Sequence, residues 1–203
     1  MNPLLRYEIP LWNQGYVHIA GVDEVGRGCL FGDVVAAAVI LPQGLKMEGI
    51  QDSKKLSASK REQLFVEIQQ HALAIGIGIS SVDLIEEINI KQASRLAMKQ
   101  AVDQLSITPD FIMIDAEQLD MALPQMSLIH GDRLSQSIAA ASIIAKVTRD
   151  HMCVEWDRQY PEYGIATHKG YATQDHRKHI LTYGETKMHR KLFLRNLLAK
   201  KTE

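Results

Sequence analysis

Cysteine is scarce in this sequence, and long apolar runs are absent from it. Only two of the 203 residues are cysteines, Cys29 and Cys153, and they lack the spacing of metal ligands. This excludes a disulfide-rich secreted scaffold and favours two free thiols in a reducing compartment. The longest apolar run, 34–41, is far too short to span a bilayer. Since the first residues also lack a signal-peptide pattern, we expect a soluble cytoplasmic protein.

A large net charge is absent too, because the formal sum is −1. The balance hides an asymmetry, since residues 168–201 contain nine Lys or Arg and only two acidic residues. That segment carries about +7 and the remainder about −8. An acidic body beside a basic segment is typical of a metal site combined with nucleic-acid binding. A solvated amphipathic helix gives the same distribution, so charge alone leaves both interpretations open.

Apolar runs of strand length alternate with longer amphipathic stretches, which predicts an α/β fold. With 46% hydrophobic residues, the chain suffices for one well-packed core. A break at Tyr160–Gly164 divides a body, 1–160, from a basic helical region, 161–203. The expected strands lie near 17–23, 34–41, 74–79, 111–115 and 126–130, the first two as a hairpin, and helices begin near Ser59, Asn89, Ser135, Thr173 and Thr186.

Acidic residues close three of the apolar runs. Asp23 and Glu24 end the first, Asp115 ends the fourth, and Asp132 follows the fifth. In an α/β sheet, sites gather where strands end, and carboxylates there can hold two metal ions about 3.5–4 Å apart. For any single acid, a role in the turn after the strand is the better explanation. It explains less well why three apolar runs end in this way. Neighbouring strand residues point to opposite faces, so Asp23 and Glu24 share a site only if the strand bends or ends between them.

A glycine-flanked arginine follows the first two acids directly. Glycines on both sides of Arg27 permit a tight turn and a close approach of a ligand to the backbone of Gly26–Gly28. The spacing lacks the third glycine of a dinucleotide-binding fingerprint, which argues against a Rossmann-type nucleotide binder. The stretch 20–28 therefore predicts a metal site with a backbone-lined pocket beside it.

Four segments carry a more specific pattern, namely Gly21–Gly28, Asp52–Leu56, Ser137–Asp150 and His168–Tyr171. In this order and spacing they resemble the motifs of bacterial ribonuclease HII, and the resemblance covers about 17–193, most of the chain. It implies a ribonuclease H-like α/β fold, with a central mixed sheet flanked by helices and a small C-terminal helical region.

The resemblance also implies an activity. The family is a metal-dependent endoribonuclease that uses two divalent ions, Mn²⁺ or Mg²⁺, to cut the RNA strand of RNA–DNA hybrids. It nicks DNA duplexes 5′ of embedded ribonucleotides, leaving 5′-phosphate and 3′-hydroxyl ends. Its ribose-sensing element falls on Gly26, Arg27 and Gly28, and its stacking tyrosine on Tyr171. Its catalytic, metal-binding acids fall on Asp23, Glu24, Asp115 and Asp132.

Polar and basic residues of the same motifs are candidates for phosphate contacts. One group lies in a loop suited to a backbone phosphate, and Lys146 and Arg149 are three apart on one helix face. For each of them a solvated surface position is the alternative. The candidates are Ser53, Lys54, Lys55, Lys146, Arg149 and Lys169, with Arg190 and Lys191 further on.

Two segments depart from the family pattern, Cys29–Asp33, where the family has prolines, and Arg190–Phe193, where it has an Arg-Arg-Ser-Phe-like run. Neither contains one of the acids. The alternatives are another nuclease of the same fold, in which Gly26–Gly28 would be idle, and a non-catalytic hybrid-binding module, which would lack an acid. We expect a monomer that acts on RNA–DNA hybrids and ribonucleotide-containing DNA, in ribonucleotide excision and in DNA replication and repair.

Overall fold

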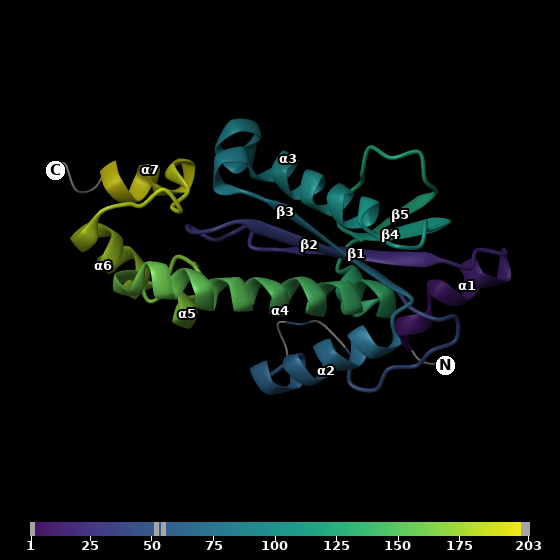
Figure 1. Ribbon diagram of the computed structural model, residues 1–203. Helices are drawn as coiled ribbons and strands as arrows, with labels where there is room; N and C mark the ends of the chain where they lie inside the picture. Colours follow the sequence, from purple (N-terminus) through teal and green to yellow (C-terminus); the bar gives the residue numbers. More distant parts are fainter. Residues whose placement is uncertain (1–2, 51–52, 54–55, 200–203) are drawn as a thin grey trace.

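Five strands form one mixed sheet, namely β1 (Ile19–Val25), β2 (Val34–Ile40), β3 (Ala74–Ser80), β4 (Phe111–Asp115) and β5 (Gln125–Leu128). Their order is β3-β2-β1-β4-β5, with β1 antiparallel to β2 and parallel to β4. The predicted hairpin and α/β sheet are thus confirmed. The structure, a computed structural model, describes residues 3–50, 53 and 56–199 (Figure 1).

Helices cover both faces of this sheet. In Figure 1 the long helix α3 lies above the sheet, α4 lies below it, and α2 lies beyond α4. No helix in the described ranges has an apolar stretch long enough to cross a membrane. The helices are α1 (Glu8–Asn13), α2 (Ala58–His71), α3 (Val82–Asp103), α4 (Gln136–Gln159), α5 (Ile165–His168), α6 (Gln174–Tyr183) and α7 (Lys191–Ala199), with 3₁₀ turns η1 (Pro3–Leu5), η3 (Gly131–Arg133) and η4 (Pro161–Tyr163).

Small residues let both long helices approach the sheet closely. A Cβ placed on Gly21 in β1 would lie 2.0 Å from the carbonyl carbon of Ser137 in α4. On the other face, a Cβ on Gly78 in β3 would lie 1.9 Å from the carbonyl oxygen of Ala97 in α3. The alanines 139–141 of α4 are fully buried against the sheet. The alanine-rich helix α4 therefore lies in close contact with the sheet.

The predicted helix start near Ser59 is confirmed to within one residue, although its cap differs, and the predicted start at Asn89 is wrong. The helix α2 begins after Ser57, whose side chain accepts a hydrogen bond from the backbone N–H of Lys60, so Ser59 is not its cap. The helix α3 begins after Ser81, well before Asn89. Asn89 nevertheless has a positive φ of 69° inside it, and its side chain accepts from the N–H groups of Lys91 and Gln92. It thus caps the second half of a kinked helix, which is the pattern that the sequence displayed.

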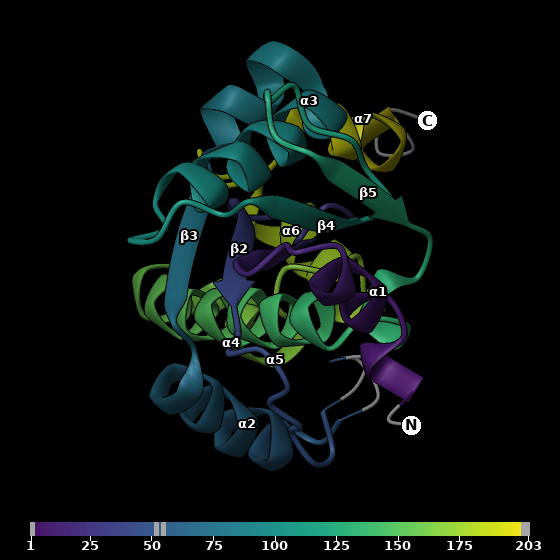
Figure 2. The ribbon, with the colours of Figure 1, turned by 90° about the vertical axis from the view of Figure 1, so that its right-hand side faces the viewer.

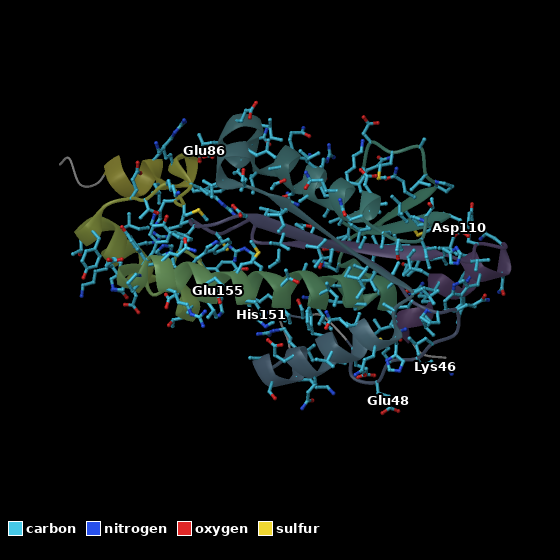
Figure 3. All side chains as sticks on the ribbon, in the orientation of Figure 1. Lys46, Glu48, Glu86, Asp110, His151 and Glu155 are labelled. Atoms are coloured by element: carbon cyan, nitrogen blue, oxygen red, sulfur yellow. The ribbon has the colours of Figure 1, made fainter. Side chains whose placement is uncertain are left out.

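The C-terminal helices pack around the loop between β1 and β2. Leu30 and Phe31 of this loop share an apolar cluster with Trp156 of α4 and with Ile180 of α6. The segment before α7 runs alongside the loop, because the N–H of Gly32 donates to the carbonyl of Met188 at 2.8 Å. The predicted helical start at Thr186 is therefore too early. Figure 2 shows the other end of the molecule, where α1 lies beside the beginning of α4.

Candidate active site

The sheet register brings two of the predicted acids side by side. Val22 of β1 is paired with Ile114 of β4, and the next residues along these parallel strands are Asp23 and Asp115. Asp132 is buried in the turn η3, between β5 and α4. The backbone N–H of Gly131 donates to Oδ1 of Asp115 at 2.7 Å, which ties this turn to the end of β4.

Asp23 and Glu24 do not share a face of the sheet. Val22 packs in the cluster under α3, and Val25 packs in the cluster on α4. By strand alternation Asp23 faces α4, where it meets Ser142, and Glu24 faces the α3 side. The strand β4 ends at Asp115, so it does not continue alongside Glu24. This open strand edge is where carboxylates from the two faces can approach one ion.

Burial and repulsion raise the pKa of both neighbouring acids. Burial raises the pKa of Asp23 well above its usual value, and the charges of Glu24 and Asp115 raise it further. Burial also raises the pKa of Glu24, against the opposing effect of Arg27. Oε2 of Glu24 is buried and has no hydrogen-bond partner in the part of the chain that the structure describes. Carboxylates crowded in this way are costly unless a cation joins them.

The donor set suits a hard divalent cation, since it consists of carboxylate oxygens. Among the described residues, no three acidic, histidine or cysteine side chains form a complete ligand set as they stand. Oε1 of Glu24 accepts a hydrogen bond from Nη1 of Arg27 at 3.3 Å, whereas Oε2 has no partner within the described residues. The carboxylates therefore fit a metal by their chemistry, and Oε2 of Glu24 is the oxygen that is open to it.

The turn Gly26–Gly28 presents backbone N–H groups outward. Nη1 of Arg190 donates to the carbonyls of Gly26 at 2.7 Å and Arg27 at 3.1 Å. In a trans peptide the N–H points away from its carbonyl, so the N–H groups of Arg27 and Gly28 face away from Arg190. Within the described part of the chain, neither N–H makes a hydrogen bond.

The two glycines of the turn have different reasons to be glycine. Gly26 has a φ of 98°, and a Cβ on it would lie 2.4 Å from Nε of Arg149. A Cβ on Gly28 would meet nothing within 4 Å. Nothing inside the protein requires a glycine at this second position, and the open space suits the close approach of a ligand.

Tyr171 lies next to this turn. It forms an isolated antiparallel bridge with Cys29, and the N–H of Leu30 donates to the carbonyl of Gly170 at 2.8 Å. The carbonyl of Tyr171 accepts from Nδ1 of His176 at 2.9 Å. Its side chain is 38% exposed. Its backbone is therefore fixed, while its ring remains accessible beside Gly26–Gly28.

The predicted phosphate contacts are dispersed. Ser53 is buried, and its Oγ is 2.9 Å from Oγ of Ser142, so it faces α4. Lys54 and Lys55 lie outside the described residues. Nζ of Lys146 pairs with Asp150 at 2.6 Å. The side chain of Lys169 is partly exposed beside Tyr171 and has no ion pair within the described ranges.

The structure contradicts phosphate contacts by two of the predicted arginines. Arg149 and Arg190 are fully buried. Arg149 donates to the carbonyls of Phe31, Asp33 and Lys169 at 2.8–2.9 Å. The three-residue spacing between Lys146 and Arg149 does not show whether the Arg149 side chain is exposed. The turn of α4 that carries Arg149 is covered by the β1–β2 loop and by Lys169. Both arginines are therefore structural supports of the loop between β1 and β2.

Three residues near the acids were not predicted. Ser142 meets Asp23 and lowers its pKa. Glu117, only two residues beyond Asp115, accepts from Arg27 and from Arg95 of α3. Proximity to a strand-end acid was a signal for Glu117, whereas nothing in the sequence linked Arg95 to this region.

Comparisons with known proteins show the family of this chain. A family model described as ribonuclease HII matches residues 20–196. The chain is 56% identical over 200 residues to ribonuclease HII of Alkaliphilus metalliredigens (strain QYMF), covering 96% of this chain and 98% of the relative.

Two solved structures share the fold. Ribonuclease H2 from Pyrococcus horikoshii OT3 has a TM-score of 0.75 at 23% identity, covering 91% of this chain and 99% of its own. Bst-RNase HIII, solved in complex with Mn²⁺, has a TM-score of 0.66 at 20% identity, covering 91% of this chain and 70% of its own. The predicted ribonuclease H-like fold is confirmed.

Proposed function

Because the chain belongs to the ribonuclease HII family, and is thus an endoribonuclease of RNA–DNA hybrids that depends on divalent metal, we propose that the clustered acids form its metal site. Two ions, Mn²⁺ or Mg²⁺, are held there in our proposal. When bound, they activate the attacking water and stabilise the 3′-oxygen that leaves. The proposed ligands are Asp23, Glu24, Asp115 and Asp132.

One observation carries this assignment, namely the burial of the Asp23 carboxylate between two others. Its pKa is raised by burial and by the charges of Glu24 and Asp115. A fold does not retain such an unfavourable arrangement for stability alone. The surrounding groups prepare it for a cation, because Ser142 and the N–H of Glu24 already orient the carboxylate, the latter at 2.7 Å.

We assign the ribose check to the turn Gly26–Gly28. The outward N–H groups of Arg27 and Gly28 suit a 2′-hydroxyl, which accepts as well as donates hydrogen bonds. Tyr171 would stack on the adjacent sugar. A substrate without the hydroxyl leaves these N–H groups unpaired, which gives strong discrimination. The turn would therefore direct nicking to the 5′ side of a single embedded ribonucleotide, leaving 5′-phosphate and 3′-hydroxyl ends.

The proposal also includes phosphate contacts, but with fewer residues than the sequence predicted. Lys169 is retained because its side chain is partly exposed beside Tyr171. Lys146 is retained with its partner Asp150, and Lys54 and Lys55 remain predictions from the sequence. Ser53 is reassigned to orienting Ser142, and through it Asp23. Arg149 is withdrawn, since a fully buried side chain does not reach a phosphate.

A duplex with one embedded ribonucleotide tests the substrate check. We expect a nick on its 5′ side with Mn²⁺ or Mg²⁺, none in excess chelator, and none in an all-DNA duplex of the same sequence. An RNA–DNA hybrid serves as the positive control. Equal cleavage of the all-DNA duplex would refute the assignment of the ribose check to this protein.

The substitution Asp132→Asn tests the metal site. Turnover should fall by about 10³-fold, because removing several kcal/mol of charge stabilisation has that effect, while duplex affinity stays nearly unchanged. The control is Asp120→Asn, since Asp120 is exposed on the loop after β4. Wild-type turnover in Asp132→Asn would remove this residue from the site.

A further inference from the structure

The side chain of Arg27 lies between two carboxylates. Its Nη1 is 3.3 Å from Oε1 of Glu24 and 3.1 Å from Oε1 of Glu117. The first carboxylate belongs to the proposed metal site, and the second does not. The Glu117 side chain is 8% exposed and that of Arg27 is 37% exposed, so the contact is partly buried. Ion pairs in such a place are screened less than those on the open surface.

Glu117 is itself held from the other side. Its Oε2 accepts from Nε of Arg95 at 2.9 Å, so each of its oxygens has one arginine partner. The residue before it, Ala116, has a φ of 50° and donates its N–H to the carbonyl of Leu128 at 3.0 Å. This backbone turn redirects the chain immediately after Asp115. Glu117 is thus fixed between α3 and the β1–β2 loop, whereas Glu24 keeps one buried oxygen without a partner.

Arg27 and a divalent ion compete for the same carboxylate. A cation bound to Glu24 repels the guanidinium and weakens its 3.3 Å contact with Oε1 of Glu24. A charged group that loses its only partner in a partly buried place is costly. Glu117 removes this cost, because it continues to accept from Arg27 when the contact with Glu24 is weakened.

We propose that Glu117 is a positioning residue for the metal site, which retains the Arg27 side chain and so releases Glu24 to the ion. The inference rests on the proposed metal site. Glu117 touches neither metal nor substrate in this role and acts through Arg27 alone. Arg95 orients Glu117 and contributes more weakly.

The test is the affinity for Mn²⁺, measured by the electron paramagnetic resonance signal of free Mn²⁺ in a titration without substrate. In Glu117→Gln, Arg27 has Glu24 as its only charged partner, so the dissociation constant should rise about tenfold, as for outer partners of metal ligands. Arg95→Met leaves Glu117 in place but loosens it, and should raise the constant about two- to threefold. Circular dichroism and thermal unfolding in chelator verify that each variant is folded.

A second variant separates a role through Arg27 from a general effect of negative charge. In the Arg27→Met background no guanidinium competes for Glu24, so adding Glu117→Gln should leave the Mn²⁺ affinity unchanged. The same tenfold loss in that background would overturn the inference, because it would be a long-range charge effect. An unchanged affinity in the single variant Glu117→Gln would overturn it as well.

Asp115→Asn distinguishes this inference from the metal site itself. If Asp115→Asn abolishes Mn²⁺ binding and Glu117→Gln does not weaken it, the metal site stands and the role of Glu117 is wrong. If Asp115→Asn leaves Mn²⁺ binding intact, the metal site and the inference both fail. Asp120→Asn, on the same loop, is the matched control and should bind Mn²⁺ as the wild type does.

Discussion

Two regions of this molecule bury charge, and they treat it in opposite ways. Burial and the charges of Glu24 and Asp115 raise the pKa of Asp23, and one oxygen of Glu24 has no hydrogen-bond partner among the described residues. The arginines behind the β1–β2 loop are buried as deeply, yet their donors meet carbonyl oxygens. Arg190 donates to Gly26, Arg27 and Gly32 at 2.6–3.1 Å.

The difference lies in whether a buried charge has hydrogen-bond partners inside the protein. The arginines have them and stabilise the fold, whereas the carboxylates around Asp23 have few in the described part of the chain and are suited to a ligand. Carbonyl oxygens satisfy a guanidinium without any bound group, so Arg149 and Arg190 support the loop permanently. Asp23, Glu24 and Asp115 have no such partners within the described residues beyond Arg27, Ser142 and two backbone N–H groups. The regions meet at Gly26, since Arg149 fills the space beside its α-carbon and Arg190 binds its carbonyl. Two buried arginines thus hold the turn Gly26–Gly28 in place directly beside the crowded carboxylates.

The largest expected change in stability comes from replacing one of the buried arginines, and its absence would contradict the comparison. Arg190→Met removes the guanidinium donors to the carbonyls of Gly26, Arg27 and Gly32, and we expect the free energy of unfolding to fall by about 3–5 kcal/mol. Urea denaturation measures it. Arg195→Met, on the exposed side of α7, is the control and should change little. A loss in Arg190→Met no larger than in the control would mean that the carbonyls are satisfied in another way.

A second effect concerns two buried histidines of the supporting region. Burial lowers the pKa of His176 to about 4 and that of His189 to about 3. Nδ1 of His189 accepts from Thr186, its Nε2 lies 3.3 Å from Nε2 of His176, and Nδ1 of His176 lies 2.9 Å from the carbonyl of Tyr171. This series of hydrogen bonds requires both histidine rings to be neutral. Protonation of either ring would place an N–H donor opposite another N–H donor.

The sign of the resulting pH dependence follows from these lowered pKa values. Unfolded histidine takes up a proton near pH 6.5, whereas the folded rings do so only near 4 and below. The unfolded state therefore binds more protons, and stability falls as pH drops from about 6.5 to 4, by about 1 kcal/mol per pH unit for each ring. Urea denaturation across this range should show the fall, and the double variant His176→Gln, His189→Gln should flatten it. An equal slope in that variant would assign the acid sensitivity elsewhere.

The acids should respond to substitution with the opposite sign. Asp23→Asn removes a buried and repelled charge, so we expect the metal-free protein to gain about 1–2 kcal/mol of stability while turnover is lost. The measurement is urea denaturation in chelator and again with Mn²⁺, where the wild type should regain the advantage. Lower stability of Asp23→Asn in chelator would show that its carboxylate is satisfied without metal.

The smallest effect is expected at Lys146. Its pair with Asp150 lies four residues apart on α4, so Lys146→Gln should change stability by no more than about 0.5 kcal/mol. If Lys146 also meets a phosphate, the logarithmic slope of duplex affinity against salt should decrease by about 1. Lys169→Gln is the companion variant. An unchanged slope in both variants would show that neither Lys146 nor Lys169 contacts a phosphate.

The sequence was informative where chemistry and local pattern coincide. The strand β4 was predicted with its final Asp115, and the positions of β1, β2 and β3 followed from apolar runs. The acids were predicted as metal ligands because strand ends and metal sites share a place in α/β folds. Helix caps were less certain, since Ser57 and Ser59 are both of a residue type that caps helices, and it is Ser57 whose side chain accepts from the N–H of Lys60.

The sequence by itself determined the sheet, the candidate acids and the glycine-flanked turn, because alternation, strand length and glycine act within a few residues of one another. Only the tertiary structure decided which charges are buried with partners and which without. From its helix alone Arg149 would be predicted to be a surface cation, yet it is covered by Phe31, Asp33 and Lys169, whose carbonyls accept its hydrogen bonds. Glu117 reads like a turn residue, yet it joins Arg27 to Arg95. Burial depends on elements distant in the chain, and it alone determines whether a charge is solvated, satisfied or left for a ligand.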